Sequence, residues 1–180
     1  MTDRLGGWSP SGEPRATPGL APVLNRVLAG YRIGDEAKQL AGRSGRLLQI
    51  DCGDGAALVA MRSCGWQVFG IEADNQLAAI ATRRQIAMLA ELPKQPVDAI
   101  VLRSHIARVD DPQKTLASLR AAVMPAGLLQ VDFHPGQLDR QRLVRLAKAC
   151  GWTVASISPS VRRVPWARPA SATWLWMRAR

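Results

Sequence analysis

The most constraining feature of this sequence is an apolar run that ends in a glycine turn, RLLQIDCGDG at 46–55. A near-continuous apolar run of this length is typical of a buried parallel strand. Because glycine has no β-carbon, Gly53 and Gly55 let the backbone approach a ligand that a side chain would exclude. The run therefore predicts a strand over 46–50 that leads into a ligand-binding turn.

A second apolar segment, WQVFGIE at 66–72, follows after one helix length and predicts a strand that ends in a carboxylate, Glu72. The carboxyl ends of parallel strands meet at one edge of a sheet, so Glu72 is expected beside the glycine turn. A carboxylate there can accept hydrogen bonds from ribose hydroxyls, and Glu72 follows Gly55 at close to the spacing of about 20 residues typical of such acids. The two segments together predict a nucleoside site.

Helical and strand patterns alternate along the chain. We expect helices over 21–31, 35–42, 56–64, 74–84, 111–123 and 137–150, and strands over 46–50, 66–72, 85–89, 97–102, 128–133, 153–157 and 172–177. This alternation predicts an α/β fold, a three-layer sandwich around a mostly parallel seven-stranded sheet, with the last two strands as an antiparallel edge hairpin. Apolar spacing turns Leu77 and Ile80 inward on one helix, and Leu143, Leu146 and Ala149 inward on the last.

The length of 180 residues fits one domain. Residues 1–18 are rich in Gly, Pro, Ser and charge, which predicts a flexible tail before a single domain over 19–180. The sequence has no apolar stretch of signal-peptide type and no run of about 18 apolar residues that would predict a membrane helix. We therefore expect a soluble, cytoplasmic protein.

The three cysteines, Cys52, Cys64 and Cys150, are an odd number and form no CxxC pair. No histidine lies near them at metal-ligand spacing, so no metal site is predicted. One interpretation is small buried thiols in a reducing compartment. The other is a nucleophilic Cys52, whose pKa would fall near a helix N-terminus.

The formal net charge is +10, and it comes mostly from arginine. Such a charge is compatible with nucleic acid or an anionic lipid surface, and equally with an acidic protein partner. An arginine-rich and alanine-rich composition also arises from a GC-rich genome, which needs no partner at all. Trp8 and the basic loop at 160–171 are candidates for a substrate lid, because tryptophan and arginine can stack on an aromatic or anionic ligand. Such residues equally serve as a surface anchor for the edge strands, and both interpretations stay open.

Three stretches in this order resemble the class I S-adenosylmethionine-dependent methyltransferases, especially the small type 11 group and those of quinone biosynthesis. Residues 47–55 are similar to the glycine-rich first motif, and 67–75 to the second strand with its ribose-binding acid. Residues 97–128 are similar to the fourth strand, the Asp-Pro helix start and the Pro-Gly-Gly turn. The resemblance implies a Rossmann-like fold, S-adenosylmethionine (SAM) as cofactor, and methyl transfer to an acceptor that stays unidentified.

The resemblance also implies site residues. The cofactor would contact Gln49, Asp51, Cys52, Gly53, Gly55, Glu72, Ala73, Leu89 and Arg103. Glu72 would hold the ribose, Ala73 would lie beneath the adenine, and Arg103 would face the reacting methyl group. Methyl transfer is a direct displacement, so alignment supplies much of the acceleration. A hydroxyl or amine acceptor also needs a general base, and His105 and His134 are the catalytic candidates because each follows the end of an expected strand.

The sequence departs from the family pattern at several positions. Gln49 stands where the family has an acid, Asp51 where it has its first glycine, and Leu89 belongs to a region that often carries an adenine-binding aspartate. Ala126 stands where a glycine often takes a positive φ, and we expect a type I turn there instead. These departures favour an alternative, a catalytically inactive methyltransferase-like domain that acts as a binding or regulatory subunit.

Two further functional classes share the strand, glycine turn and helix pattern. A Rossmann-like domain with no nucleoside ligand stays open, because a fold does not dictate a function. A nicotinamide oxidoreductase is disfavoured, because its GxGxxG fingerprint would need glycine or alanine at Leu58.

Overall fold

The computed structural model describes residues 40, 43–103, 106, 109–133, 139–159 and 173–180. The expected tail over 1–18, His105, His134 and the basic loop at 160–171 lie outside the described residues, as do the two N-terminal helices apart from Leu40. The described elements are β1 (Gly45–Ile50), α3 (Ala56–Ser63), β2 (Trp66–Ile71), α4 (Asn75–Arg83), β3 (Ala87–Met88), β4 (Val97–Leu102), α5 (Pro112–Ala121), β5 (Val123–Phe133), α6 (Arg140–Ala149), β6 (Trp152–Pro159) and β7 (Thr173–Ala179).

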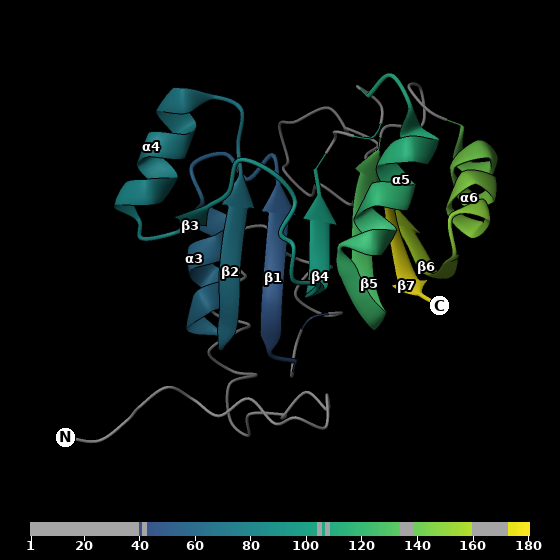
Figure 1. The fold of residues 1–180 in the computed structure, drawn as a ribbon, viewed down its shortest axis with the longest axis horizontal. Coiled ribbons are helices and arrows are strands. Elements are labelled where there is room, and N and C mark those ends of the chain that lie inside the picture. Colours follow the sequence, from purple (N-terminus) through teal and green to yellow (C-terminus); the bar gives the residue numbers. More distant parts are fainter. Residues whose placement is uncertain (1–39, 41–42, 104–105, 107–108, 134–138, 160–172) are drawn as a thin grey trace.

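The seven strands form one sheet in the order β3-β2-β1-β4-β5-β7-β6 (Figure 1). The pairs from β3 to β5 are parallel, whereas β7 runs antiparallel to both β5 and β6. β7 lies between β5 and β6. The last described strand is therefore an inner strand of the sheet, and β6 is an edge strand. The predicted mostly parallel sheet with an antiparallel C-terminal hairpin is confirmed.

Helices cover both faces of the sheet, with α5 in front and α3 behind in Figure 1. On the α3 face, Leu47 of β1 belongs to a buried cluster with Leu58 of the helix. On the opposite face, Leu48 belongs to a second cluster with Leu116 of α5 and Leu143 of α6. Neighbouring residues of β1 thus enter two different cores, as expected for a strand with helices on both sides. The predicted three-layer sandwich is confirmed.

The inward faces of two helices differ from the prediction. On α4, Leu77 is 36% exposed and Ile80 is half-buried, while Ala81 is fully buried. A β-carbon on Gly55 would lie 3.1 Å from the Ala81 β-carbon, so this helix approaches the glycine turn through a small residue. On α6, Ala149 is exposed and Ala147 is buried instead. In each helix a buried alanine stands where a larger apolar residue was predicted, and alanine carries too little apolar surface to stand out in a hydrophobic pattern.

Acidic caps begin α4 and α5 where the sequence predicted them, and α6 with a shift. The Asp74 carboxylate accepts hydrogen bonds from the backbone N–H groups of Gln76 and Leu77, and Asp111 accepts one from Lys114. The last helix begins at Arg140 rather than Gln137, because Asp139 is its cap. Such caps satisfy N–H groups that have no partner within the helix.

The segment 124–127, where a type I turn is expected, lies inside β5 and has a different conformation. β5 begins at Val123, which pairs with Val97, and the register then jumps so that Leu128 pairs with Ala99. Ala126 has φ 61°, a left-handed conformation, whereas both central residues of a type I turn have negative φ. The predicted turn type is therefore wrong, and alanine adopts here the conformation that the family gives to glycine.

Ala126→Gly is expected to stabilise the protein by up to about 1 kcal/mol, because glycine takes a positive φ without the β-carbon clash. The matched control is Ala117→Gly on the exposed face of α5, where the same change should destabilise by about 1 kcal/mol. Urea unfolding of each variant and of the original chain measures the change in the free energy of unfolding and its sign. Destabilisation of equal size in both variants would contradict the assigned conformation.

Candidate functional site

The turn between β1 and α3 is built from residues in the left-handed conformation. Asp51 has φ 57°, Gly53 has φ 59° and Gly55 has φ 75°. Aspartate is among the few residues besides glycine that adopt this conformation with some regularity. Asp51 can thus occupy the position of the first family glycine without changing the course of the backbone.

Glu72 ties this turn to the end of β2. Its carboxylate Oε2 accepts a hydrogen bond of 2.7 Å from the Gly53 N–H, and its Oε1 accepts one of 2.9 Å from the Asp74 N–H. A carboxylate has about four acceptor positions, so each oxygen keeps room for a second donor. The Glu72 side chain is half-buried, which leaves it within reach of a ligand while the two backbone bonds orient it.

The two glycines of the turn have different surroundings. A β-carbon placed on Gly53 would meet no atom of the residues that the structure describes within 4 Å, so among these residues open space lies over Gly53. A β-carbon on Gly55 would lie 3.0 Å from Ile86 Cγ1 and 3.1 Å from the Ala81 β-carbon. Close packing against the protein thus explains why residue 55 lacks a side chain. Only Gly53 leaves room on its open side for a ligand.

Cys52 is a buried thiol beneath the turn, 6% exposed. A β-carbon on Gly70 would lie 2.7 Å from Cys52 Sγ, so the thiol occupies the space over that glycine of β2. Burial, with a smaller contribution from the nearby Glu72 carboxylate, raises the pKa of Cys52 to about 11. The thiol is therefore protonated at neutral pH, and the hypothesis of a nucleophilic Cys52 with a lowered pKa is wrong.

The raised pKa of Cys52 predicts a loss of stability in alkali. Between about pH 9 and pH 11 the folded protein keeps a proton that the unfolded chain releases, so the free energy of unfolding falls as the pH rises. Urea unfolding at pH 8 and pH 10 should show a smaller fall for Cys52→Ala than for the original chain. Burial also raises the pKa values of Cys64 and Cys150, which contribute equally to the loss of stability in both proteins. An equal loss of stability in Cys52→Ala and in the original chain would contradict the raised pKa of Cys52.

The remaining cofactor candidates lie along the same edge of the sheet. Leu89 donates its N–H to the Gly70 carbonyl at 2.8 Å, and Arg103 donates its N–H to the Ile50 carbonyl at 3.4 Å. Ala73 is exposed directly after Glu72. Gln49 differs, because its side chain is only 4% exposed and, two residues after Leu47, belongs to the α3 face. The structure thus gathers the turn, Glu72, Leu89 and Arg103 at the carboxyl ends of β1 to β4.

An ion pair that the sequence analysis missed holds the turn from the side of α4. Arg84 Nη1 lies 2.6 Å from Asp54 Oδ2 and also donates to the Asp54 carbonyl at 3.0 Å. The other carboxylate oxygen of Asp54 accepts a hydrogen bond from the Ala56 N–H at the start of α3. An acid two residues before a helix is a recognisable capping signal, but no local signal connects it to an arginine 30 positions later.

A family model described as "Methyltransferase domain" matches residues 25–143, which is more than half of the chain. The chain belongs to this methyltransferase family. The match includes the glycine turn, Glu72 and the fourth strand, the segments on which the resemblance rested. The predicted relationship to the class I S-adenosylmethionine-dependent methyltransferases is confirmed.

Solved structures share the fold of this methyltransferase-family chain at low sequence identity. A TehB-like SAM-dependent methyltransferase from Corynebacterium glutamicum has a TM-score of 0.67 at 15% identity, over 90% of this chain and 100% of that one. The glycopeptide N-methyltransferase MtfA, complexed with S-adenosyl-L-homocysteine (SAH), has a TM-score of 0.67 at 16% identity, over 93% of this chain and 100% of that one. The [4+2]-cyclase SpnF has a TM-score of 0.66 at 16% identity, over 89% of this chain and 93% of that one.

A search of the curated proteins finds no match to this methyltransferase-family sequence. Among the helices that the structure describes, none has the length and apolar character needed to cross a membrane. Nor do the described residues bring three His, Cys, Asp or Glu side chains together in a group that could hold a metal ion.

Proposed function

We propose that this methyltransferase-family domain binds SAM at the glycine turn and transfers its methyl group to an acceptor that stays unidentified. The observation that carries the proposal is the Glu72 carboxylate, which two backbone N–H groups orient at the end of β2 beside the open face of Gly53. A carboxylate held in this way offers its remaining lone pairs to the two hydroxyls of a ribose. The fold and the family match support the same cofactor.

The residues present fit a nucleoside with a short charged tail. Glu72 would hold the ribose, with Ala73 and Leu89 beside the base, while the backbone of 51–53 would flank the methionine part. SAM supplies a methyl group on a sulfonium, which a well-aligned nucleophile displaces directly. The protein's own part is then to orient the two reactants and exclude water. His105 and His134 stay our proposed general bases for an acceptor that must lose a proton.

Calorimetric titration of the full chain with SAH tests the cofactor assignment. We expect one site per chain and a dissociation constant in the micromolar range, which corresponds to about −8 kcal/mol. NAD serves as the control, because the turn has leucine at the last position of the nicotinamide fingerprint, and it should give no heat. No heat with SAH from a protein that is folded by circular dichroism would overturn the assignment.

Turnover needs a separate measurement, since a domain that binds SAH could still serve as a binding subunit. Radiolabelled methyl-SAM incubated with the protein and an extract of small molecules and macromolecules should transfer label to an acceptor. His105→Ala and His134→Ala are then expected to lower the rate by about 100-fold where the acceptor needs a base. Tight SAH binding with no labelled product would favour the inactive alternative.

A further inference from the structure

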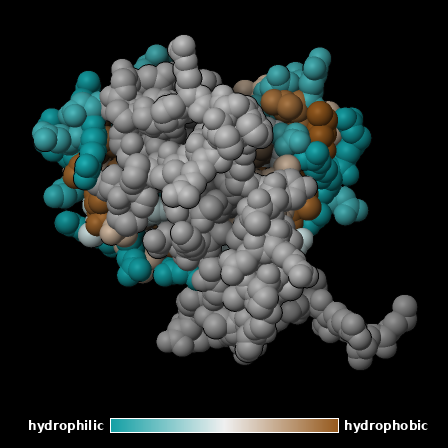
Figure 2. Space-filling model, turned by 180° about the vertical axis from the view of Figure 1, so that it is seen from behind, coloured by the Kyte–Doolittle hydropathy of each residue, from teal (hydrophilic) through white to brown (hydrophobic). Residues whose placement is uncertain are grey.

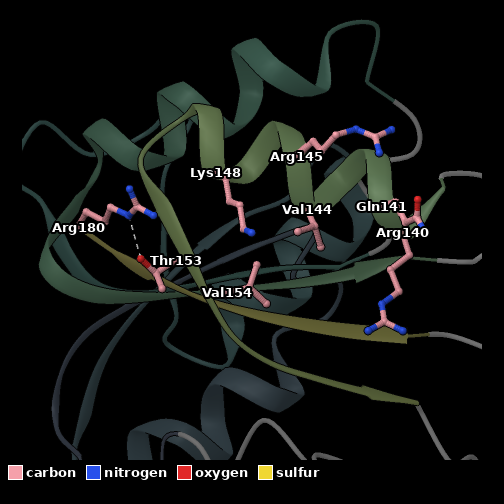
Figure 3. Close-up of a pocket in the computed structure, with 8 residues that line it drawn as sticks. All are labelled: Arg140, Gln141, Val144, Arg145, Lys148, Thr153, Val154 and Arg180. Atoms are coloured by element: carbon pink, nitrogen blue, oxygen red, sulfur yellow. Dashed lines mark hydrogen bonds between the residues drawn. The ribbon is translucent and has the colours of Figure 1, made fainter.

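A groove of about 930 Å³ lies between α6 and the edge strand β6, away from the cofactor site (Figure 3). In the sheet order, β6 is four strands from β1. At roughly 4.8 Å per strand, this separation is about 19 Å. The groove therefore belongs to neither the proposed SAM site nor its carboxyl-end crevice.

The walls of the groove are basic. The described residues that line it include four cationic side chains and no acidic side chain; the cations are Arg140, Arg145, Lys148 and Arg180. The guanidinium of Arg180 is held in place, since its Nε donates a hydrogen bond of 3.0 Å to Thr153 Oγ1. An anionic partner would meet several positive charges along the groove, and the guanidinium of Arg180 is already oriented.

The floor of the groove is apolar. Val144 of α6 and Val154 of β6 point toward one another between the helix and the strand in Figure 3, and both are only half-buried. Both side chains pack at the border of the buried cluster that α6 closes over the sheet. An occupant that covered them would add apolar contacts to the ionic ones.

The edge of β6 offers hydrogen bonds to an added strand. In the part of the chain that the structure describes, β6 pairs with β7 alone. The Arg180 N–H donates to the Gly151 carbonyl, which makes these two residues a hydrogen-bonded pair. By the alternation of an antiparallel ladder, Thr153 also directs its backbone groups to β7, whereas Trp152 and Val154 direct theirs to the open edge.

Only the first half of this edge is suited to pairing. A register shift between Val154 and Ser156 interrupts the ladder, and Pro159 ends the strand. Bulges and prolines are devices that keep edge strands from pairing with other chains. The segment 152–154 lacks both, and it is this segment that borders the groove.

We propose that this groove binds an extended, acidic peptide segment of a partner protein, which adds a short strand to the 152–154 edge of β6. Its backbone pairs with Trp152 and Val154, its apolar side chains cover Val144 and Val154, and its carboxylates face Arg140 and Lys148. Nucleic acid fits this groove less well. None of the described lining residues is an aromatic on which a base could stack, and a phosphodiester backbone cannot complete a strand ladder.

Fluorescence anisotropy with a labelled peptide tests the proposal on the full chain. The peptide carries Glu, Val and Glu at every second position with Thr between them, so that both carboxylates and the apolar side chain lie on the α6 side of the added strand. We expect saturable binding that weakens at least about fivefold in Arg140→Glu and in Lys148→Glu, because each replaces an attraction by a repulsion. Arg142→Glu is the matched control. Arg142 lies in the first turn of α6, as Arg140 does, but it is exposed and does not line the groove. Peptide binding should therefore be unchanged in this variant.

A second probe separates strand addition from simple charge attraction. The same peptide with all its backbone nitrogens methylated keeps every charge but cannot donate a backbone hydrogen bond to a strand edge, and we expect it to bind at least about tenfold more weakly. Equal binding of the methylated peptide, no binding of the parent peptide, or an effect of Arg142→Glu as large as that of Arg140→Glu would overturn the proposal. Tighter binding of a single-stranded RNA of the same charge, lost in Arg140→Glu, would overturn it in favour of nucleic acid.

Discussion

Glu72→Ala is expected to weaken SAH binding by about 100-fold or more. Each hydrogen bond to a charged acceptor contributes about 1.5 to 3 kcal/mol, and a ribose can form two with this carboxylate. The substitution also removes the acceptor of the Gly53 N–H, so the turn loses one of the contacts that place it. Titration of the variant against the original chain measures the change in the dissociation constant.

Two companion variants interpret this loss. Glu72→Gln keeps the size of the side chain, but its amide nitrogen cannot accept from the Gly53 or Asp74 N–H, so an intermediate affinity is expected. Asp139→Ala removes the cap of the distant α6 and costs about 1 kcal/mol of stability without touching the site. SAH affinity that falls equally in Asp139→Ala and Glu72→Ala would mean that general destabilisation, not the ribose contact, causes the loss.

Gly55→Ala is expected to cost more stability than Gly53→Ala but to cost less affinity for SAH. At Gly55 the new β-carbon meets Ile86 and Ala81 at 3.0 and 3.1 Å and the residue has φ 75°, so the free energy of unfolding should fall by about 2 to 4 kcal/mol. At Gly53 the strain of the positive φ remains, but the β-carbon meets nothing, and the cost should be about 1 kcal/mol.

The order reverses for cofactor affinity. An alanine at 53 places a methyl group in the open space that we assign to the ligand, and SAH binding should weaken by about tenfold or more. Gly55→Ala, measured at a temperature where the variant is folded, should bind SAH within about threefold of the original chain. Urea unfolding gives the free energy of unfolding of both variants, and titration gives their dissociation constants for SAH. Unchanged affinity in Gly53→Ala would place the ligand elsewhere.

The sheet and its order along the chain were predictable because periodicity reports burial directly. β1 and β4 are buried on both faces, and their near-continuous apolar runs predicted their bounds to within a residue. The acids at Asp74 and Asp111 predicted helix starts because capping is a local interaction. The antiparallel hairpin was also predicted, but the insertion of β7 beside β5 was not, since pairing across a sheet leaves no local signal.

The residues of the candidate site were predictable from the sequence, but the surroundings of each side chain were not. Gly53 and Gly55 are the same residue two positions apart, yet one borders open space and the other packs against α4 and the segment after it. The raised pKa of Cys52 arises from burial beneath the turn, whereas sequence position alone suggested the opposite shift. The pairing of Asp54 with Arg84 depends on how α4 lies against the turn. Each of these properties belongs to the packed fold.

The central claim is that Glu72 and the open face of Gly53 form the nucleoside end of a SAM site, and a crystal structure of the protein grown with SAH tests it most directly. The account predicts density for the ligand along the carboxyl ends of β1 and β2, with both ribose hydroxyls within about 3.2 Å of the Glu72 carboxylate oxygens. A fully occupied ligand at another place in the molecule, or an empty turn in crystals of a protein saturated with SAH, would contradict it.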